Sequence, residues 1–315
     1  MKLVIQMPCF NEAETLSIAL SALPRVVPGF DTVEWLVIDD GSKDDTVNIA
    51  KTNGVDHIIR HTGNKGLAQA FMTGLEASLL LGADVIVNTD ADNQYNAEDI
   101  PALVQPILEH KAEIVVGARP IKTIDYFSSV KKLLQRFGSW VVRVASKTNI
   151  PDAPSGFRAM SRAAAQRLMV FNDYTYTLEM IIQAGQKNMG IISIPVRVND
   201  DLRPSRLVKS ISSYIKSSIF TIIRIFVIYR PFRFFGVIGM ILFGAGFLIG
   251  SRFLWHYFQG NGEGHVQSLI LASVLLGMGF QTLLVAFVAD LLAANRKLIE
   301  DIRCKINKNI YTKHS

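Results

Sequence analysis

Two long stretches without charge limit what this chain can fold into more than any other feature. No Asp, Glu, Lys or Arg occurs from Phe234 to Ser251 or from Val266 to Ala289. An apolar, uncharged run of roughly 18 residues or more is long enough to cross the hydrocarbon core of a bilayer as a helix. Both stretches therefore predict transmembrane helices. Two helices buried in a soluble core are the alternative.

The flanks of these stretches predict their orientation. Lys and Arg are frequent before the first (RIFVIYRPFR) and after the second (NRKLIEDIRCK), whereas the turn between them (HYFQGNGEGH) has neither. Since cytoplasmic loops are enriched in Lys and Arg, we expect the N-terminal part and both termini in the cytoplasm. The spacing of Gly246 and Gly250 matches a motif of helix association, which suggests a homo-oligomer.

The composition excludes some classes of protein. The formal charge of +6 is too small to predict a nucleic-acid partner. Only two cysteines occur, Cys9 and Cys304, so we expect no disulfide framework and a reducing compartment. The start, MKLVIQMPCFNE, reaches Asn and Glu after a short apolar run, which predicts a first strand and not a signal peptide.

Apolar runs rich in β-formers alternate with helical segments over the first 230 residues. This alternation predicts an α/β fold with a mostly parallel sheet covered on both faces. Asn11, Ser42 and Asn96 are each followed three residues later by an acidic residue, which predicts three helix N-caps. The predicted strands are 2–8, 33–40, 56–61, 83–90 and 112–119, with further short strands within 155–160 and 189–198.

Polar clusters follow four of these strands. The clusters are PCFNE, DDGS, DADNQ and GARP, in chain order. In open sheets of this kind, ligands bind beyond the carboxyl ends of the strands. We therefore expect the four clusters to form one site.

Asp90 and Asp92 are the most informative pair in that site. In an extended segment, residues i and i+2 point the same way, so both carboxylates and Gln94 would face one point. Carboxylates held together repel unless a cation lies between them. Oxygen ligands suit Mg²⁺ or Mn²⁺, and magnesium commonly joins a carboxylate to phosphate oxygens. The pair predicts a metal that carries a phosphorylated ligand. A polar loop in which Asp92 or Asn93 caps a turn is the alternative.

Other polar residues allow simpler interpretations. Either Asp39 or Asp40 can bind a base or a ribose, and one of them can cap the following helix. Cys9 is expected to pack and not to react. The three histidines of the N-terminal part are expected on the surface; they are His57, His61 and His110.

Taken together, PCFNE, VIDDGSKDDT, DAD-x-Q, GAR and SGFRAMSR resemble the family 2 glycosyltransferases, which have a GT-A fold with a Rossmann-like, nucleotide-sugar-binding domain. The two C-terminal membrane helices and the basic segment before them resemble the polyprenyl-phosphate glycosyltransferases, among them the dolichyl-phosphate mannose synthases. We expect residues 1–206 as the catalytic domain, 231–295 as the membrane helices and 296–315 as a basic tail. Residues 207–230 are apolar with interspersed Lys and Arg, which predicts an amphipathic juxtamembrane helix in the membrane interface, and an ordinary covering helix is the alternative.

The resemblance also implies a role for each matching residue. Pro8, Phe10 and Glu12 would line the nucleotide pocket, Asp39 or Asp40 would hold the base, Asp90 and Ala91 would contact the sugar nucleotide, and Asp92 and Gln94 would bind Mg²⁺ or Mn²⁺. Arg119 and Arg136 would hold phosphate. In the family, an arginine and a glycine precede Ser-Lys-Leu at the acceptor site. Here the stretch is the shorter DDLRPSRLVKS, so Arg203 and Arg206 both remain candidates.

The implied activity is inverting, metal-dependent hexosyl transfer from a UDP- or GDP-sugar to a polyprenyl phosphate at the membrane. A processive polysaccharide synthase is one alternative, but its Gln-x-x-Arg-Trp motif is absent at that spacing and two membrane helices are few for a polymer channel. A membrane adaptor that keeps the fold without activity is another. A nucleotidyltransferase would need a Gly-rich basic loop, which PCFNEAET is not.

Overall fold

The computed structural model describes residues 1–120, 143, 146–170, 176–200, 220, 223–224, 227–260 and 266–312. The chain divides into two compact units, Met1–Ser218 with Arg303–Ser315, and Ile219–Ile302. Three of the predicted site residues lie outside the described residues, as does most of the predicted juxtamembrane helix. These three are Arg136, Arg203 and Arg206.

The first unit contains a seven-stranded sheet in the order β3-β2-β1-β4-β6-β5-β7. β6 is antiparallel to β4 and β5, and every other neighbouring pair is parallel. The predicted mostly parallel sheet is confirmed. The strands are β1 (Lys2–Cys9), β2 (Thr32–Asp39), β3 (His57–Arg60), β4 (Val85–Asn88), β5 (Ile114–Ala118), β6 (Arg158–Ser161) and β7 (Ile191–Pro195).

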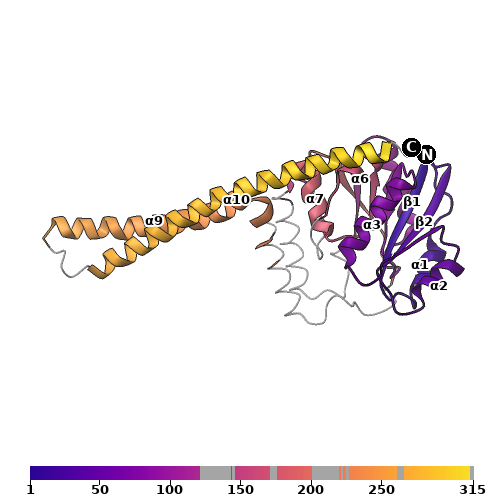
Figure 1. Ribbon diagram of the computed structural model, residues 1–315, viewed down its shortest axis with the longest axis horizontal. Coiled ribbons are helices and arrows are strands. Elements are labelled where there is room, and N and C mark those ends of the chain that lie inside the picture. The colour runs from indigo at the N-terminus through magenta and orange to yellow at the C-terminus, as the bar shows by residue number, and fades with distance from the viewer. Residues whose placement is uncertain are drawn as a thin grey trace. The chain divides into compact units, whose positions relative to one another are not determined.

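Helices cover both faces of this sheet (Figure 1). Ile5 and Val37 share one buried cluster with Leu20 of α1 and Leu103 of α4. On the other face, the Phe71 ring of α3 stacks on Tyr176 of α7 with 4.4 Å between ring centroids. Burial on both faces explains why β1 is an almost continuous apolar run. The helices are α1 (Leu16–Ala22), α2 (Thr46–Thr52), α3 (Leu67–Leu80), η1 (Ala97–Asp99), α4 (Ile100–Leu108), α6 (Arg162–Arg167) and α7 (Tyr176–Gln186).

The strand order reverses between β1 and β4. β2 and β3 lie on one side of β1, whereas β4 lies on the other. The carboxyl ends of β1 and β4 therefore lie side by side at the point where the order reverses, which is the usual ligand position in open sheets of this kind. β5 and β4 are both antiparallel to β6, so their carboxyl ends lie at the same edge as those of β1, β2 and β3.

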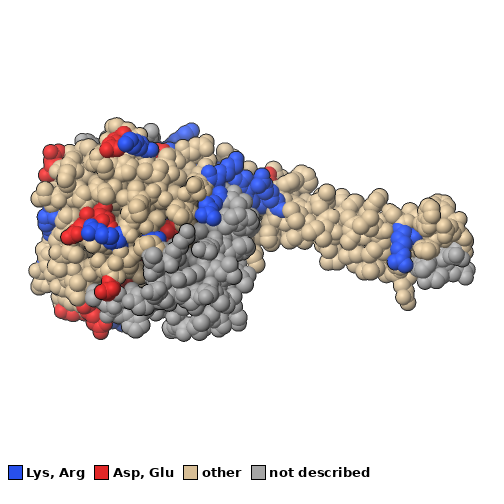
Figure 2. Space-filling model, turned by 180° about the vertical axis from the view of Figure 1, so that it is seen from behind, with Lys and Arg blue, Asp and Glu red and all other residues tan. Residues whose placement is uncertain are grey.

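The second unit contains α9 (Pro231–Phe258) and the part of α10 (Val266–Thr312) that ends at Ile302. α10 extends across much of the predicted tail. Both helices are long and apolar enough to cross a membrane, and only 17% of the most apolar stretch of each is buried. Such exposure is untypical of core helices in a soluble protein. Figure 2 shows a long tan stretch without charge along the middle of the visible face of the hairpin, which ends at a blue patch short of the outer end.

The glycines that suggested association between chains pack within this hairpin. A Cβ on Gly246 would lie 2.8 Å from the backbone nitrogen of Leu276, and one on Gly250 would lie 3.7 Å from Cβ of Ala272. Small residues permit this close approach of two membrane helices. Their spacing is therefore explained inside one chain, and the homo-oligomer stays a prediction.

Candidate active site

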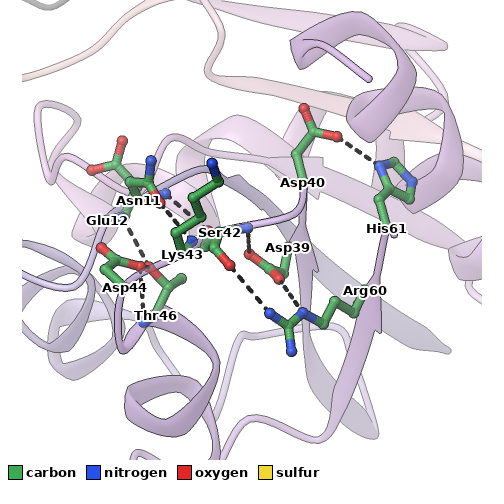
Figure 3. A network of polar contacts seen from close by, with 10 residues as sticks. All are labelled: Asn11, Glu12, Asp39, Asp40, Ser42, Lys43, Asp44, Thr46, Arg60 and His61. Carbon is green, nitrogen blue, oxygen red and sulfur yellow. Dashed lines mark hydrogen bonds and ion pairs between the residues drawn. The ribbon is translucent and has the colours of Figure 1, made fainter. Parts of the chain in front are cut away.

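The loops that follow β1 and β2 are joined by hydrogen bonds (Figure 3). The N–H of Asn11 donates to Oγ of Ser42 at 2.8 Å, and Oδ1 of Asn11 accepts from the N–H of Lys43 at 2.8 Å. Asn11 has a φ of 55°, a left-handed conformation that asparagine tolerates well. The prediction that Asn11 and Ser42 cap helices is wrong, because α1 and α2 begin after Thr15 and Asp45. The two side chains connect neighbouring loops instead.

Two further hydrogen bonds join the same loops just after Asn11. The N–H of Glu12 donates to Oγ1 of Thr46 at 2.9 Å, and the N–H of Ala13 donates to Oδ2 of Asp44 at 3.0 Å. Of the three residues expected to line the nucleotide pocket, Pro8 is buried within β1, Glu12 is half-buried and Phe10 is exposed. The hydrogen bonds of Glu12 and Ala13 fix the loop after β1 against the loop after β2.

Both carboxylate oxygens of Asp40 take part in structural hydrogen bonds. Its Oδ1 lies 2.7 Å from Nδ1 of His61 and accepts from the N–H of Lys65 at 2.8 Å, while its Oδ2 accepts from the N–H of Gly66 at 2.8 Å. His61 is therefore buried, and its predicted surface position is wrong. His110 is exposed, as predicted.

Asp39 differs from Asp40. It is fully buried, and its Oδ1 accepts from the N–H of Ser42 at 3.0 Å. Its Oδ2 accepts no hydrogen bond from the described residues, although Nε of Arg60 lies 3.1 Å away (Figure 3). Of the two carboxylates that the sequence left as alternatives, Asp39 is the one with an oxygen that no described donor satisfies.

The segment after β4 turns. Asn93 has a φ of 57°, and Oδ1 of Asp92 accepts from the N–H of Gln94 at 3.0 Å. The expected extended conformation is therefore wrong, and Asp92 caps a turn. Burial, and after it the negative charge of Asp92, raise the pKa of Asp90 to about 7. The intervening Ala91 is buried.

A loop before β6 closes against Asp90. The N–H of Gly156 donates to the hydroxyl oxygen of Tyr95 at 3.0 Å, and Nδ2 of Asn88 donates to the carbonyl oxygen of Gly156 at 2.9 Å. A Cβ on Gly156 would lie 2.8 Å from Oδ2 of Asp90. The absent side chain leaves room for the carboxylate.

Two arginines lie in this region. Arg119, directly after β5, donates to buried Asp152 from Nε at 2.7 Å and from Nη2 at 3.0 Å. Its remaining nitrogen, Nη1, takes no part in this ion pair. Arg158 is fully buried and donates from Nε to the carbonyl oxygen of Ser155 at 2.8 Å and from Nη2 to that of Ala153 at 2.7 Å. The positive charge of Arg158 lowers the pKa of Asp90 and so partly offsets the increase caused by burial.

The donor set fits a divalent cation shared with a ligand. Within the described ranges, no group of three or more His, Cys, Asp or Glu side chains could hold a metal by itself. Asp90 and Asp92 are two carboxylates on one turn, and burial disfavours charge on the first. Magnesium is often bound by one or two carboxylates together with substrate phosphates and water. The residues present match that pattern.

The sequence prediction missed several of these residues. Arg60 ends β3 and His61 follows it directly, so the rule that polar residues at strand ends form the site could have found both. Asp152, Gly156 and Arg158 come from β6 and the loop before it. No local pattern places this antiparallel strand between β4 and β5.

Comparison with known proteins agrees with this geometry. Residues 4–169 match the family described as glycosyl transferase family 2. The undecaprenyl-phosphate mannosyltransferase of Micrococcus luteus is 28% identical over 207 residues, which cover 62% of this chain and 83% of that protein. The dolichol-phosphate mannosyltransferase of Pyrococcus furiosus is 28% identical over 271 residues, which cover 81% and 72%.

A solved structure shares the fold. Glucosyl-3-phosphoglycerate synthase from Mycobacterium tuberculosis, crystallised with Mn²⁺, uridine diphosphate and glucosyl-3-phosphoglycerate, matches 70% of this chain and 79% of its own with a TM-score of 0.54 and 21% identity. At that identity the likeness shows the fold alone. The family match spans more than half of the chain, and this protein therefore belongs to glycosyl transferase family 2.

Proposed function

We propose that this protein transfers a sugar from a nucleoside diphosphate sugar to a polyprenyl phosphate on the cytoplasmic side of a membrane. Asp90 and Asp92 carry the proposal, because both lie in the segment after β4, at the sheet edge where β2 ends in Asp39, and the charge of Asp92 acts on Asp90. Family membership supports glycosyl transfer. The names of the Micrococcus luteus and Pyrococcus furiosus relatives support the lipid phosphate acceptor.

The nucleotide would occupy the end of β1 and β2. Phe10 is 39% exposed directly after β1 and offers an aromatic face to a base. The carboxylate of Asp39 provides an acceptor with an unsatisfied oxygen. Pro8 and Glu12 would line the rest of the nucleotide pocket. Asp40 has a structural role, since its oxygens bind His61 and the loop before α3.

The diphosphate would lie beside the turn after β4, with Asp90 and Ala91 against the sugar nucleotide. Asp92 and Gln94 would hold Mg²⁺ or Mn²⁺, which agrees with the Mn²⁺ in the structural neighbour. A bound ion supplies positive charge to the leaving diphosphate. Arg119 keeps Nη1 for a phosphate oxygen, while Asp152 fixes the rest of its guanidinium group. Arg136 is proposed for the same task.

The acceptor needs no strong base. A phosphate monoester has its second pKa near 6 and is mostly a dianion at neutral pH. One of its oxygens attacks the anomeric carbon, the bond from that carbon to the diphosphate breaks, and the nucleoside diphosphate leaves with the bonding electrons. No proton has to move, and direct displacement inverts the anomeric centre. Arg203 or Arg206 would hold the lipid phosphate, close in sequence to the membrane helices.

The test uses the full-length protein in detergent with polyprenyl phosphate, Mg²⁺ or Mn²⁺ and a panel of labelled nucleotide sugars. We expect label that extracts with the lipid from one donor, loss of transfer in Asp92→Asn, and retention in Glu109→Gln, an exposed carboxylate at the end of α4. Label found only in free polysaccharide would favour the polysaccharide synthase. Nucleotide binding without turnover for any donor would favour the adaptor.

A further inference from the structure

Asn199, which follows β7, binds the backbone of the turn after β4. Its Nδ2 donates to the carbonyl oxygen of Asn93 at 2.9 Å and to that of Tyr95 at 3.3 Å. Its backbone N–H donates to the carbonyl oxygen of Gln94 at 2.9 Å. Three successive carbonyl oxygens of the turn therefore accept hydrogen bonds from one residue, which lies 106 positions after Asn93 in the chain.

The conformation of this turn depends on such a partner. Asn93 has a φ of 57°, and a left-handed residue interrupts the regular pairing of a strand. The hydrogen bond from the N–H of Gln94 to Oδ1 of Asp92 fixes a donor of the turn, but not its carbonyl oxygens. Backbone carbonyl groups that are shielded from water need a hydrogen-bond donor. The directions of Asp92 and Gln94 therefore depend on the segment after β7.

That segment, residues 196–199, is itself anchored at the carboxyl edge of the sheet. β7 pairs with β5 as far as Pro195, which lies opposite Ala118, and the N–H of Val196 donates to the carbonyl oxygen of Ala118 at 3.0 Å. Tyr95 and Val198 then form an isolated antiparallel bridge. β6 separates β5 from β4 in the sheet, so residues 196–199 join two strand ends that are not neighbours.

The turn is held at a second point through the side chain of Tyr95. Its hydroxyl oxygen accepts from the N–H of Gly156 at 3.0 Å, and its ring stacks on that of Phe157 with 5.1 Å between ring centroids. Gly156 is the residue that lies against Asp90. A shift of the turn would therefore also disturb the loop that closes against Asp90.

Asn199 acts through the turn and not on a ligand. A side-chain amide nitrogen carries two hydrogens, and the carbonyl oxygens of Asn93 and Tyr95 accept from this one. Groups that orient metal ligands without touching the metal are often as important as the ligands themselves. Asn199 has the contacts of such a group.

We infer that Asn199 is a positioning residue for a divalent cation, because it fixes the backbone that carries Asp92 and Gln94. The inference rests on the proposed function, in which these two residues hold Mg²⁺ or Mn²⁺ beside a nucleoside diphosphate. Loss of a residue that orients metal ligands typically lowers metal affinity or activity roughly 10- to 100-fold. We expect a loss of this size when the side-chain amide of Asn199 is removed.

Calorimetric titration of the full-length protein in detergent tests the inference. UDP and GDP are each titrated in Mn²⁺ and in chelator, and the ratio of the two affinities of one nucleotide reports the contribution of the metal. In the parent protein we expect Mn²⁺ to tighten the binding of at least one nucleotide. In Asn199→Ala we expect this gain to fall roughly 10- to 100-fold, while the affinity in chelator stays that of the parent protein.

Two further variants assign the effect to the hydrogen bonds of Asn199. Asn199→Leu keeps a side chain of similar size without an N–H donor, so it should lose the same part of the Mn²⁺ gain. Arg197→Ala is the matched control, because Nε of Arg197 joins the same two segments through Oδ1 of Asp99 at 2.9 Å. That contact is made to η1, beyond the turn, and Arg197→Ala should keep the full gain. Circular dichroism confirms that each variant is folded.

The outcomes separate this inference from the proposed function. A parental Mn²⁺ gain in Asn199→Ala and Asn199→Leu would overturn the inference and leave a nucleotide-sugar transferase standing. An equal loss in Arg197→Ala would show that Asn199 serves general stability, which also overturns its role toward the metal. A parent protein that binds nucleotide equally well in chelator would remove the metal, and the inference with it. A folded parent protein that binds neither nucleotide would count against the proposed function as well.

Discussion

His61 and Asp40 form a buried hydrogen-bonded pair, with 2.7 Å between Nδ1 of the histidine and Oδ1 of the carboxylate. Nε2 of His61 lies 3.0 Å from Oγ1 of Thr73 in α3. Since Asp40 also binds the N–H groups of Lys65 and Gly66, this pair joins the end of β2 to the start of α3. Its task is to hold together the loops that carry the candidate base site.

Removing this histidine should therefore cost stability. We expect His61→Ala to lower the free energy of unfolding by about 1–3 kcal/mol, because a buried carboxylate loses a partner. Denaturant titration followed by circular dichroism measures the change. The matched control is His57→Ala at the other end of β3, whose partner Glu34 lies 2.9 Å away but is partly exposed. That pair should contribute only about 0–1 kcal/mol. Equal losses from the two variants would contradict the proposed role of the buried pair.

Gly156→Ala should impair transfer without unfolding the protein. The added Cβ would lie 2.8 Å from Oδ2 of Asp90, so the carboxylate has to rotate away. A shift of this size at a reacting centre can cost roughly 100-fold in rate. The lipid-extraction assay measures the loss, and circular dichroism confirms the fold. Gly190→Ala is the control, because its Cβ would meet no atom closer than 3.5 Å. Unchanged activity in Gly156→Ala would show that the position of Asp90 is not critical.

Stability without metal should fall as pH rises toward neutrality. Burial, helped by the charge of Asp92, raises the pKa of Asp90 from 3.8 to about 7. Between these values the folded protein keeps a proton that the unfolded chain has released, so increasing pH favours unfolding. Melting temperatures measured in chelator across this window should decline, and Asp90→Asn should flatten the decline.

Glu109→Gln is the control of opposite sign for this experiment. Hydrogen bonds from Lys111 and Gln105 lower the pKa of Glu109, so ionisation of this exposed group favours the folded state. Its removal should leave the decline in place. A profile that stays equally steep in Asp90→Asn would show that another group is responsible.

The hairpin of α9 and α10 should depend on one glycine and not on its neighbour. A side chain at Gly246 would meet the backbone of α10 at Leu276 and Ala272, whereas one at Gly244 meets nothing within 4 Å. We expect Gly246→Leu to destabilise the protein in detergent by about 1–3 kcal/mol and Gly244→Leu to have little effect. Both variants gain the same helix propensity, so their difference in melting temperature isolates packing. Equal melting temperatures would mean that the helices do not pack through Gly246.

The amino-acid sequence by itself determined the features that depend on local pattern. Charge-free length identified α9 and α10, and alternation of strand and helix identified the mostly parallel sheet. The strand-end rule selected Asp39, Asp40, Asp90 and Asp92, because parallel strands share one carboxyl edge whatever their order.

Tertiary structure alone decided how those side chains are used. Asp39 and Asp40 are adjacent in sequence, yet the loop after β3 takes both oxygens of Asp40 and leaves one of Asp39. The antiparallel β6 brings Gly156 against Asp90 from 66 positions along the chain, counted as 156 minus 90. The physical reason is that a polar atom's partner depends on which distant segment folds beside it, whereas hydrophobic period and charge-free length are properties of the segment itself.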